Sequence, residues 1–174
     1  MPLDPLPRAA RAANALTLAG ALPFVALALL IPFGPPLARQ AGQFALGEQI
    51  AWWAGVALVL YAAAILSFLG GIRFGAATVE ALRPGARRDI VLSVVPSLAA
   101  WGLAIVGMLG QFSGFTVITA VALALLALCF LAQWLWDRAS VRADRLPDWF
   151  GPMRTRVTAI VAPTLLAAAI LIVL

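Results

Sequence analysis

The sequence predicts an all-α integral membrane protein, built as a bundle of five transmembrane helices. Of its 174 residues, 64% are hydrophobic and only 11% are charged. A transmembrane helix needs about 20 predominantly apolar residues, so this apolar content suffices for about five spans. A soluble domain carries roughly 25% charged residues, which this composition does not approach. Five spans leave only short loops, too little for an extramembrane domain with its own core.

Five apolar runs organise residues 1–174 into a single membrane domain. The first run follows Arg8 and Arg11, as in a signal peptide, but it is longer than a signal-peptide core, so we interpret it as a helix. The second run opens with the pair Trp52-Trp53, which is typical of an anchor at the membrane interface. The predicted spans cover residues 14–33, 50–72, 90–109, 115–136 and 155–174.

Prolines and glycines predict where these helices depart from straight rods. Pro23, Pro96 and Pro163 lie inside the first, third and fifth spans, where each permits a kink. Helical character in the second span can continue to Leu82, which gives a helix of about 50 Å. A bilayer core is only about 30 Å thick, so we expect this helix to tilt, to bend or to emerge from the membrane, and Gly70-Gly71 is the natural place for a bend.

Arginines are distributed unequally between the two ends of the predicted bundle. One end collects the N-terminal segment, the connection between spans 2 and 3 and the connection between spans 4 and 5. The other end has Arg39 alone. By the positive-inside rule, the N-terminus faces the cytoplasm and the C-terminus faces the opposite side. The arginines of the predicted cytoplasmic end are Arg8, Arg11, Arg73, Arg83, Arg87, Arg88, Arg138, Arg142, Arg145, Arg154 and Arg156.

The composition also excludes several kinds of chemistry. The chain has no His and no Lys, so imidazole bases, His-ligated metals and lysine Schiff bases are absent. Its single cysteine, Cys129, cannot form an intrachain disulfide or a cysteine-based zinc site. No GxSxG, HExxH or P-loop motif occurs. We therefore expect no catalytic residue, cofactor or metal site, and no binding of nucleic acid, because membrane topology explains the arginines.

A ridge of small residues marks the second span. Ala63, Ser67, Gly71 and Gly75 are spaced four apart, with Gly70 beside them. Small residues at this spacing allow another helix to approach closely. We interpret the ridge as a packing surface within the monomer, which a large residue at Gly71 would disrupt. A homodimer interface and a ligand groove remain alternatives.

Arg73 is the charge that lies deepest in a predicted span. We expect its long side chain to reach, or snorkel, to the cytoplasmic headgroups. The alternative is an ion pair with Glu80 or with a carboxylate near the connection between spans 4 and 5. That region offers Asp137, Asp144 and Asp148. Apart from end residues, the spans contain no carboxylate, which disfavours a proton- or cation-coupled transporter.

Polar residues also surround Pro96 in the third span. Ser93, Ser97 and Trp101 are spaced four apart, and the hydroxyls can satisfy the carbonyls that the proline frees. The alternative is a small polar cavity that faces Gln133 of the fourth span. Asp89 precedes this span and is expected to cap its N-terminus.

Three motifs give the chain a family resemblance. They are YAAAILSFLGGIRFG at residues 61–75, SVVPSLAAW at residues 93–101 and LPDWFGPMRTRVT at residues 146–158. In this order they resemble domain-of-unknown-function family 3429, a family of small bacterial multi-pass membrane proteins related to an animal mitochondrial transmembrane protein. The likeness runs from about residue 14 to the end of the chain.

The resemblance implies architecture and motif positions, and no reaction. Arg73 departs from the family pattern, which has His or other residues at that position. The motif positions carried over are Ser67, Phe68, Gly70, Gly71, Gly75, Pro96, Ser97, Trp101, Asp137, Pro147, Trp149 and Arg154.

These observations favour a non-enzymatic structural, assembly or accessory role in the bacterial inner membrane, with a mitochondrial inner membrane as the alternative. Anionic lipid or a membrane-protein partner is expected at the cytoplasmic face, and a homo-oligomer stays open. The alternative function is a small transporter or channel for an ion or small solute, with a lipid-modifying enzyme as a weaker third. The candidate functional or packing residues are Ser67, Gly70, Gly71, Arg73, Gly75, Pro96, Ser97, Trp101, Gln133, Asp137, Trp149 and Arg154.

Overall fold

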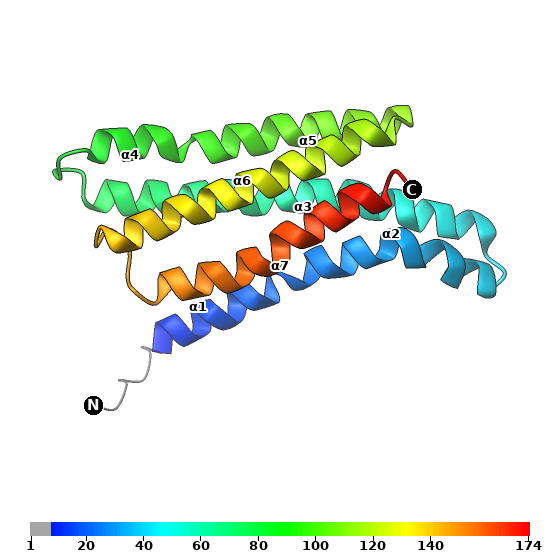
Figure 1. The fold of residues 1–174 in the computed structure, drawn as a ribbon, viewed down its shortest axis with the longest axis horizontal. Coiled ribbons are helices and arrows are strands. Elements are labelled where there is room, and N and C mark those ends of the chain that lie inside the picture. Colours follow the sequence, from blue (N-terminus) through cyan, green and yellow to red (C-terminus); the bar gives the residue numbers. More distant parts are fainter. Residues whose placement is uncertain (1–7) are drawn as a thin grey trace.

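The computed structural model describes residues 8–174, and this range contains seven α-helices and no strand (Figure 1). The helices form five segments long and apolar enough to cross a membrane, which confirms the predicted all-α class and the number of spans. The helices are α1 (Arg8–Ala19), α2 (Leu22–Gln40), α3 (Phe44–Val79), α4 (Ala86–Ser93), α5 (Val95–Ser113), α6 (Thr116–Arg142) and α7 (Phe150–Leu171).

Two of the five segments are divided next to a proline. The first segment breaks between α1 and α2, and Pro23 lies in the first turn of α2. The third breaks at Val94, and Pro96 lies in the first turn of α5. Proline lacks an N–H group and clashes with the preceding turn, so it is tolerated best where a helix begins. In contrast, α7 continues through Pro163 without a break.

The second segment is one uninterrupted helix. α3 has 36 residues, about 54 Å at 1.5 Å per residue, and therefore extends beyond a bilayer core of about 30 Å. The helix is not interrupted at Gly70-Gly71, because a glycine costs only about 1 kcal/mol in a helix interior and neighbouring helices pack alongside. The extra length carries α3 to the charged end of the molecule.

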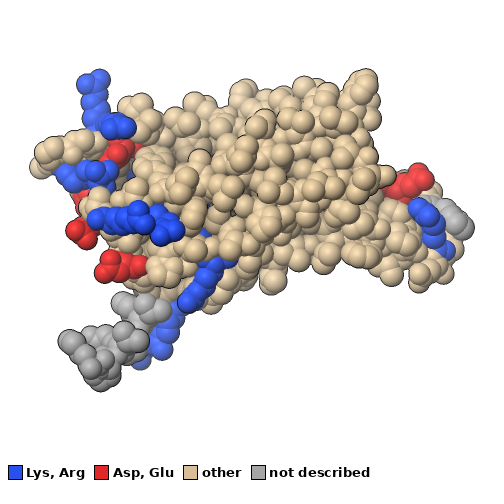
Figure 2. All heavy atoms as spheres, viewed as in Figure 1, with Lys and Arg blue, Asp and Glu red and all other residues tan. Residues whose placement is uncertain are grey.

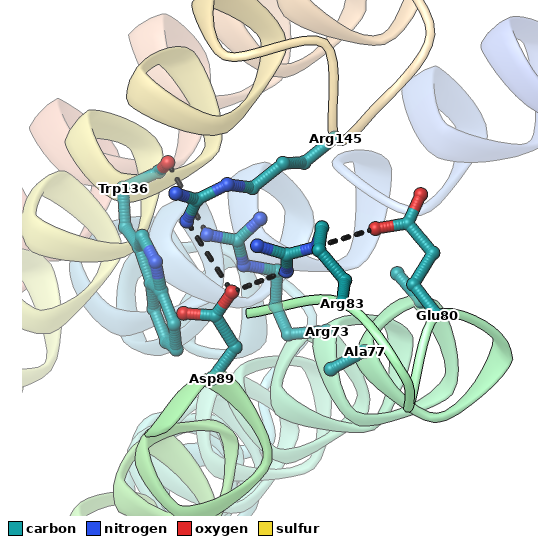
Figure 3. A pocket seen from close by; sticks show the side chains of 8 residues that line it. Arg73, Ala77, Glu80, Arg83, Asp89, Trp136 and Arg145 are labelled. Carbon is teal, nitrogen blue, oxygen red and sulfur yellow. Dashed lines mark hydrogen bonds and ion pairs between the residues drawn. The ribbon is translucent and has the colours of Figure 1, made fainter. Parts of the chain in front are cut away.

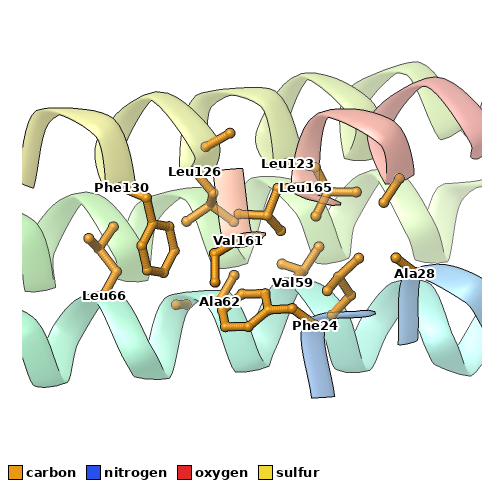
Figure 4. Close-up of a cluster of buried hydrophobic side chains, with 14 of the residues drawn as sticks. Phe24, Ala28, Val59, Ala62, Leu66, Leu123, Leu126, Phe130, Val161 and Leu165 are labelled. Carbon is orange, nitrogen blue, oxygen red and sulfur yellow. The ribbon is translucent and has the colours of Figure 1, made fainter. Parts of the chain in front are cut away.

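The helices pack as a closed ring around one apolar core. α3 packs between α2 and α5, α6 packs between α5 and α7, and α7 returns to α2. The antiparallel pairing of α5 with α6, expected from their short connection, is present (Figure 1). Figure 4 shows the interior side chains, which are almost completely removed from solvent. They include Phe24, Val59, Ala62, Leu66, Leu123, Leu126, Phe130, Val161 and Leu165.

The small-residue ridge of α3 does not pack as predicted. A Cβ added at Gly71 or Gly75 would meet no other atom within 4 Å, and both residues are exposed. The close contact is at Gly70, where an added Cβ would lie 2.7 Å from the carbonyl oxygen of Ser93. The predicted packing within the monomer is therefore wrong for Gly71 and Gly75. Ala63 of the same ridge is buried in the core, and Gly70 is on the helix face that meets the junction of α4 and α5.

Charged side chains gather at the two ends of the bundle, and the long flank between them is apolar in this view (Figure 2). We call the end formed by the start of α1, the α3–α4 connection and the α6–α7 connection the arginine-rich end. The opposite end holds Arg39 and Glu48. The apolar flank is therefore the surface that lipid chains would cover.

The contact at Gly70 generates the first testable prediction. A Gly70→Ala substitution should destabilise the protein by about 1–3 kcal/mol, because the new methyl group overlaps the Ser93 carbonyl. Gly71→Ala is the matched control, since it adds the same methyl group to open space and should be neutral or slightly stabilising. Reversible unfolding in mixed micelles measures both, and equal stability of the two variants would contradict this packing.

Candidate functional site

A buried charged cluster joins three helices at the arginine-rich end. Asp137 of α6 lies between Arg73 of α3 and Arg154 of α7, and their side chains are 1%, 7% and 2% exposed. The Nε atom of Arg154 donates a hydrogen bond of 2.8 Å to Oδ2 of Asp137. Nε of Arg73 lies 3.6 Å from Oδ1 of the same carboxylate. We call Arg73, Gln133, Asp137, Ser140 and Arg154 the Asp137 cluster.

Arg73 is held inside the bundle by contacts on several sides. Its Nη2 atom donates to Oγ of Ser140 at 2.6 Å and to the carbonyl oxygen of Trp136 at 3.3 Å. The guanidinium also lies over the indole ring of Trp136, 4.1 Å from the ring centroid. The expected snorkelling to the headgroups is therefore wrong. Asp137 supplies a buried counter-charge and the indole face stabilises the cation, so the side chain stays within the protein.

One face of α6 provides most of this site. Gln133, Asp137 and Ser140 are spaced four and three apart, so they lie on the same helix face. Nε2 of Gln133 donates a hydrogen bond of 3.2 Å to Oδ1 of Asp137. Ser140 and Trp136 were not among the predicted site residues. The signal that could have found them is this polar stripe in an otherwise apolar helix.

A second ion network lies next to the cluster and nearer the surface (Figure 3). Oδ2 of Asp89 accepts hydrogen bonds from Arg83 at 2.7 Å and from Arg145 at 3.3 Å. Arg83 also donates to Glu80 at 2.8 Å. The hydrogen bond to Asp89 raises the pKa of the Arg83 guanidinium, which keeps it charged. We call these four residues the Asp89 network.

The Asp89 network ties three separate segments together. Asp89 does not cap the helix as predicted, because α4 begins at Ala86 after Gly85, and the carboxylate instead faces Arg83 and Arg145. Arg145 is placed by a helix C-terminus of the Schellman type, in which its N–H bonds the Ser140 carbonyl at 2.9 Å. The cavity between this network and Arg73 measures about 20 Å³, which is room for about one water molecule.

The two networks together contain one more positive charge than negative charge. Four arginines (Arg73, Arg83, Arg145 and Arg154) face three carboxylates (Glu80, Asp89 and Asp137). Two buried guanidinium nitrogens, Nε of Arg73 and Nη2 of Arg154, have no hydrogen-bond acceptor within the described residues. Buried charges and unpaired donors are costly, and this part of the bundle keeps a surplus positive charge and two unused hydrogen-bond donors.

The remaining predicted site residues do not join this cluster. Oγ of Ser97 donates to the Ser67 carbonyl at 3.3 Å, across the contact between α3 and α5. Ser93 Oγ donates at 2.6 Å to the Ile90 carbonyl in its own helix. Trp101 is exposed on α5, and Trp149 is half-buried beside Phe150.

The alternative prediction for the region around Pro96 was a small polar cavity, and the described residues do not form one. A cavity of about 360 Å³ does lie between Pro96 and Gln133, and its lining is mostly apolar. Neither Ser93 nor Ser97 belongs to that lining. The serines instead donate to the carbonyls of Ile90 and Ser67. Neither is the Leu92 carbonyl that Pro96 leaves without its helical donor, so the first interpretation of this region is not confirmed.

The geometry makes Asp137 a structural counter-ion. Both of its oxygens face buried donors, because Oδ2 accepts a hydrogen bond from Arg154 and Oδ1 faces Gln133 and Arg73. Among the described residues, no group of three or more His, Cys, Asp or Glu side chains is placed to hold a metal ion.

The sequence profile of a family described as proteins of unknown function, DUF3429, matches residues 9–170. The chain belongs to the DUF3429 family. The matched range contains the Asp137 cluster and the Asp89 network, so both lie in the DUF3429 domain itself. No curated protein and no solved structure matches the chain.

Removal of the central carboxylate should weaken the DUF3429 bundle. Asp137→Asn keeps the shape of the side chain but leaves two buried guanidinium groups without their anion. We expect a loss of about 3–5 kcal/mol in the free energy of unfolding, the range measured when one partner of a buried pair is removed. Asp148→Asn is the control, because Asp148 is exposed and forms no ion pair in the described structure. Equal unfolding of both variants in micelles would refute this role.

Proposed function

We propose that this protein has a non-enzymatic structural or accessory role in the membrane, in which its arginine-rich end binds a membrane-protein partner. The observation that carries the proposal is the separation of an apolar interior from one charged end. The Asp137 cluster fixes the ends of α3, α6 and α7, so the connections around them form a preorganised surface. A preorganised surface loses less entropy when it binds a partner.

The interior gives less support to transport. A small polar solute needs a hydrated path lined by polar groups, whereas the residues at the centre of the helix ring are Leu, Val, Ala and Phe. The small polar cavity of about 20 Å³ lies at the arginine-rich end. A transporter or channel remains the alternative function, with any pore formed between protomers.

The partner surface consists of arginines that are not held in the internal networks. Arg154 and Asp137 are buried, and Arg83 and Arg145 are held by Asp89. The exposed arginines available to a partner are Arg87, Arg88, Arg138, Arg142 and Arg156. A partner with an acidic segment at the same membrane surface fits this charge.

The orientation that we propose places the arginine-rich end in the cytoplasm and the C-terminus on the opposite side. It rests on eleven arginines at one end against one at the other. The bacterial inner membrane is the location that we propose, with the mitochondrial inner membrane as the alternative.

A reporter enzyme tests the orientation. Alkaline phosphatase is active only outside the cytoplasm, so its fusion after Leu174 should be active, and a fusion after Gly85 should be inactive. Green fluorescent protein fused at the same two positions should give the reverse pattern. The opposite result at both positions would contradict the proposed topology.

Photocrosslinking tests the partner surface. A photoreactive amino acid at Arg88 or Arg142 in intact membranes should form an adduct of one discrete mass. The same amino acid at Gln49, at the opposite end, serves as the control and should not form it. Charge reversal of Arg87 and Arg156 should reduce the adduct several-fold. Equal adducts from all three positions would refute a specific surface, and an adduct with a second copy would show a homo-oligomer instead.

A further inference from the structure

A large apolar pocket opens on the side of the bundle. It has a volume of about 480 Å³, within the range of roughly 300–1,000 Å³ typical of small-molecule sites. Its walls come from α1, α3 and α7, with Phe24 and Phe130 at its base. Leu16 of α1 and Phe68 of α3 line it and are 73% and 65% exposed, so its mouth opens between these two helices. We call it the lateral pocket.

The lateral pocket has one charged residue in its lining, Arg154. The Nε atom of this side chain is used by Asp137, whereas its buried Nη2 atom has no acceptor. Thr17 also lines the pocket, and its hydroxyl donates a hydrogen bond of 2.7 Å to the Ala13 carbonyl. Arg154 lines the pocket, but its Nη2 atom has no exposed surface there, so a ligand in the pocket reaches this unused donor only when the Arg154 side chain shifts toward the lining.

The charge balance specifies what kind of partner this is. The Asp137 cluster contains two arginines and one aspartate, so it has a net positive charge in a buried place. The Asp89 network adds no surplus negative charge, because Glu80 and Asp89 face Arg83 and Arg145. An anion satisfies both the charge and the unused donor, and a neutral group satisfies only the donor.

The rest of the pocket fits a hydrocarbon chain. The lining away from Arg154 is aliphatic and aromatic, and the mouth lies on the flank that faces lipid. Trp149 lines the pocket beside Phe150, one helical turn before Arg154 at the arginine-rich end. Tryptophan is enriched at the level of lipid headgroups, so this end of the pocket lies near that level. One amphiphile can therefore place its acidic group near Arg154 and its hydrocarbon tail against the apolar lining.

We propose that the lateral pocket is a binding site for an anionic phospholipid of the surrounding bilayer. Its phosphate accepts a hydrogen bond from the Arg154 guanidinium, whose Nη2 atom turns toward the pocket when the lipid binds, and one acyl chain lies along the apolar wall between α1 and α3. The site goes beyond the proposed partner surface, since it lies inside the bundle and uses none of the exposed arginines.

Native mass spectrometry of the detergent-solubilised protein tests this site. The protein is loaded from vesicles of phosphatidylcholine with an equal amount of phosphatidylglycerol, and the retained lipid is counted. The wild-type protein should retain one phosphatidylglycerol. Arg154→Gln should retain roughly tenfold less, as expected for one lost charge-assisted hydrogen bond. Arg39→Gln, which changes an exposed arginine at the opposite end of the bundle, should retain as much as the wild type.

A second variant keeps the test valid if Arg154→Gln does not fold. Ala13→Phe narrows the pocket from α1 without touching the Asp137 cluster, and it should lower phosphatidylglycerol retention by a similar factor. Equal retention of phosphatidylcholine would overturn the role of Arg154. Displacement of phosphatidylglycerol by oleate at equal concentration would overturn the bilayer phospholipid as occupant. Charge-reversal variants of Arg87 and Arg156 should lose the photocrosslinked partner and still retain phosphatidylglycerol. That result would show that the partner surface and the lipid site are independent of each other.

Discussion

The fold depends on how the bundle holds three charged side chains, those of Arg73, Asp137 and Arg154, in its interior. Among the described residues, Asp137 is the carboxylate that pairs with both of the buried arginines, Arg73 and Arg154, and each arginine comes from a different helix. A buried charge that loses its partner is very costly, so α3, α6 and α7 are held in one relative position at this end. Gln133, Ser140 and the face of Trp136 satisfy further groups of the same cluster. Apolar packing alone closes the rest of the ring.

The contrast between the charged Asp137 cluster and the apolar packing of the rest of the ring explains where polar groups lie in the molecule. Between lipid chains, association of helices relies on close packing, which the Gly70 contact and the interior of Leu, Ala and Phe provide. Packing of this kind leaves no polar path through the centre. The buried ion networks lie at the arginine-rich end, and the lateral pocket opens beside them. Arg154 belongs to both, because it pairs with Asp137 and also lines the pocket.

The sequence was sufficient for the fold class because apolar length and charge asymmetry are properties of local composition. Two of the three prolines that it marked, Pro23 and Pro96, lie at breaks, whereas α7 continues through Pro163, so a proline alone did not decide where a helix breaks. It was insufficient wherever the outcome depended on the rotation of one helix against another. Gly71 and Gly75 have the spacing of a packing ridge, yet Gly70 makes the contact. Arg73 has the length to snorkel, yet a carboxylate 64 positions later in the chain holds it inside.

A double-mutant cycle between Asp137 and Arg154 tests the central role of the buried carboxylate most directly. The free energy of unfolding is measured in micelles for the wild type, Asp137→Asn, Arg154→Met and the double variant. If the two side chains stabilise the bundle as a pair, the double variant will lose less than the summed single losses, by about 1–3 kcal/mol. Additive losses within about 0.5 kcal/mol would show that the pair does not hold α6 to α7.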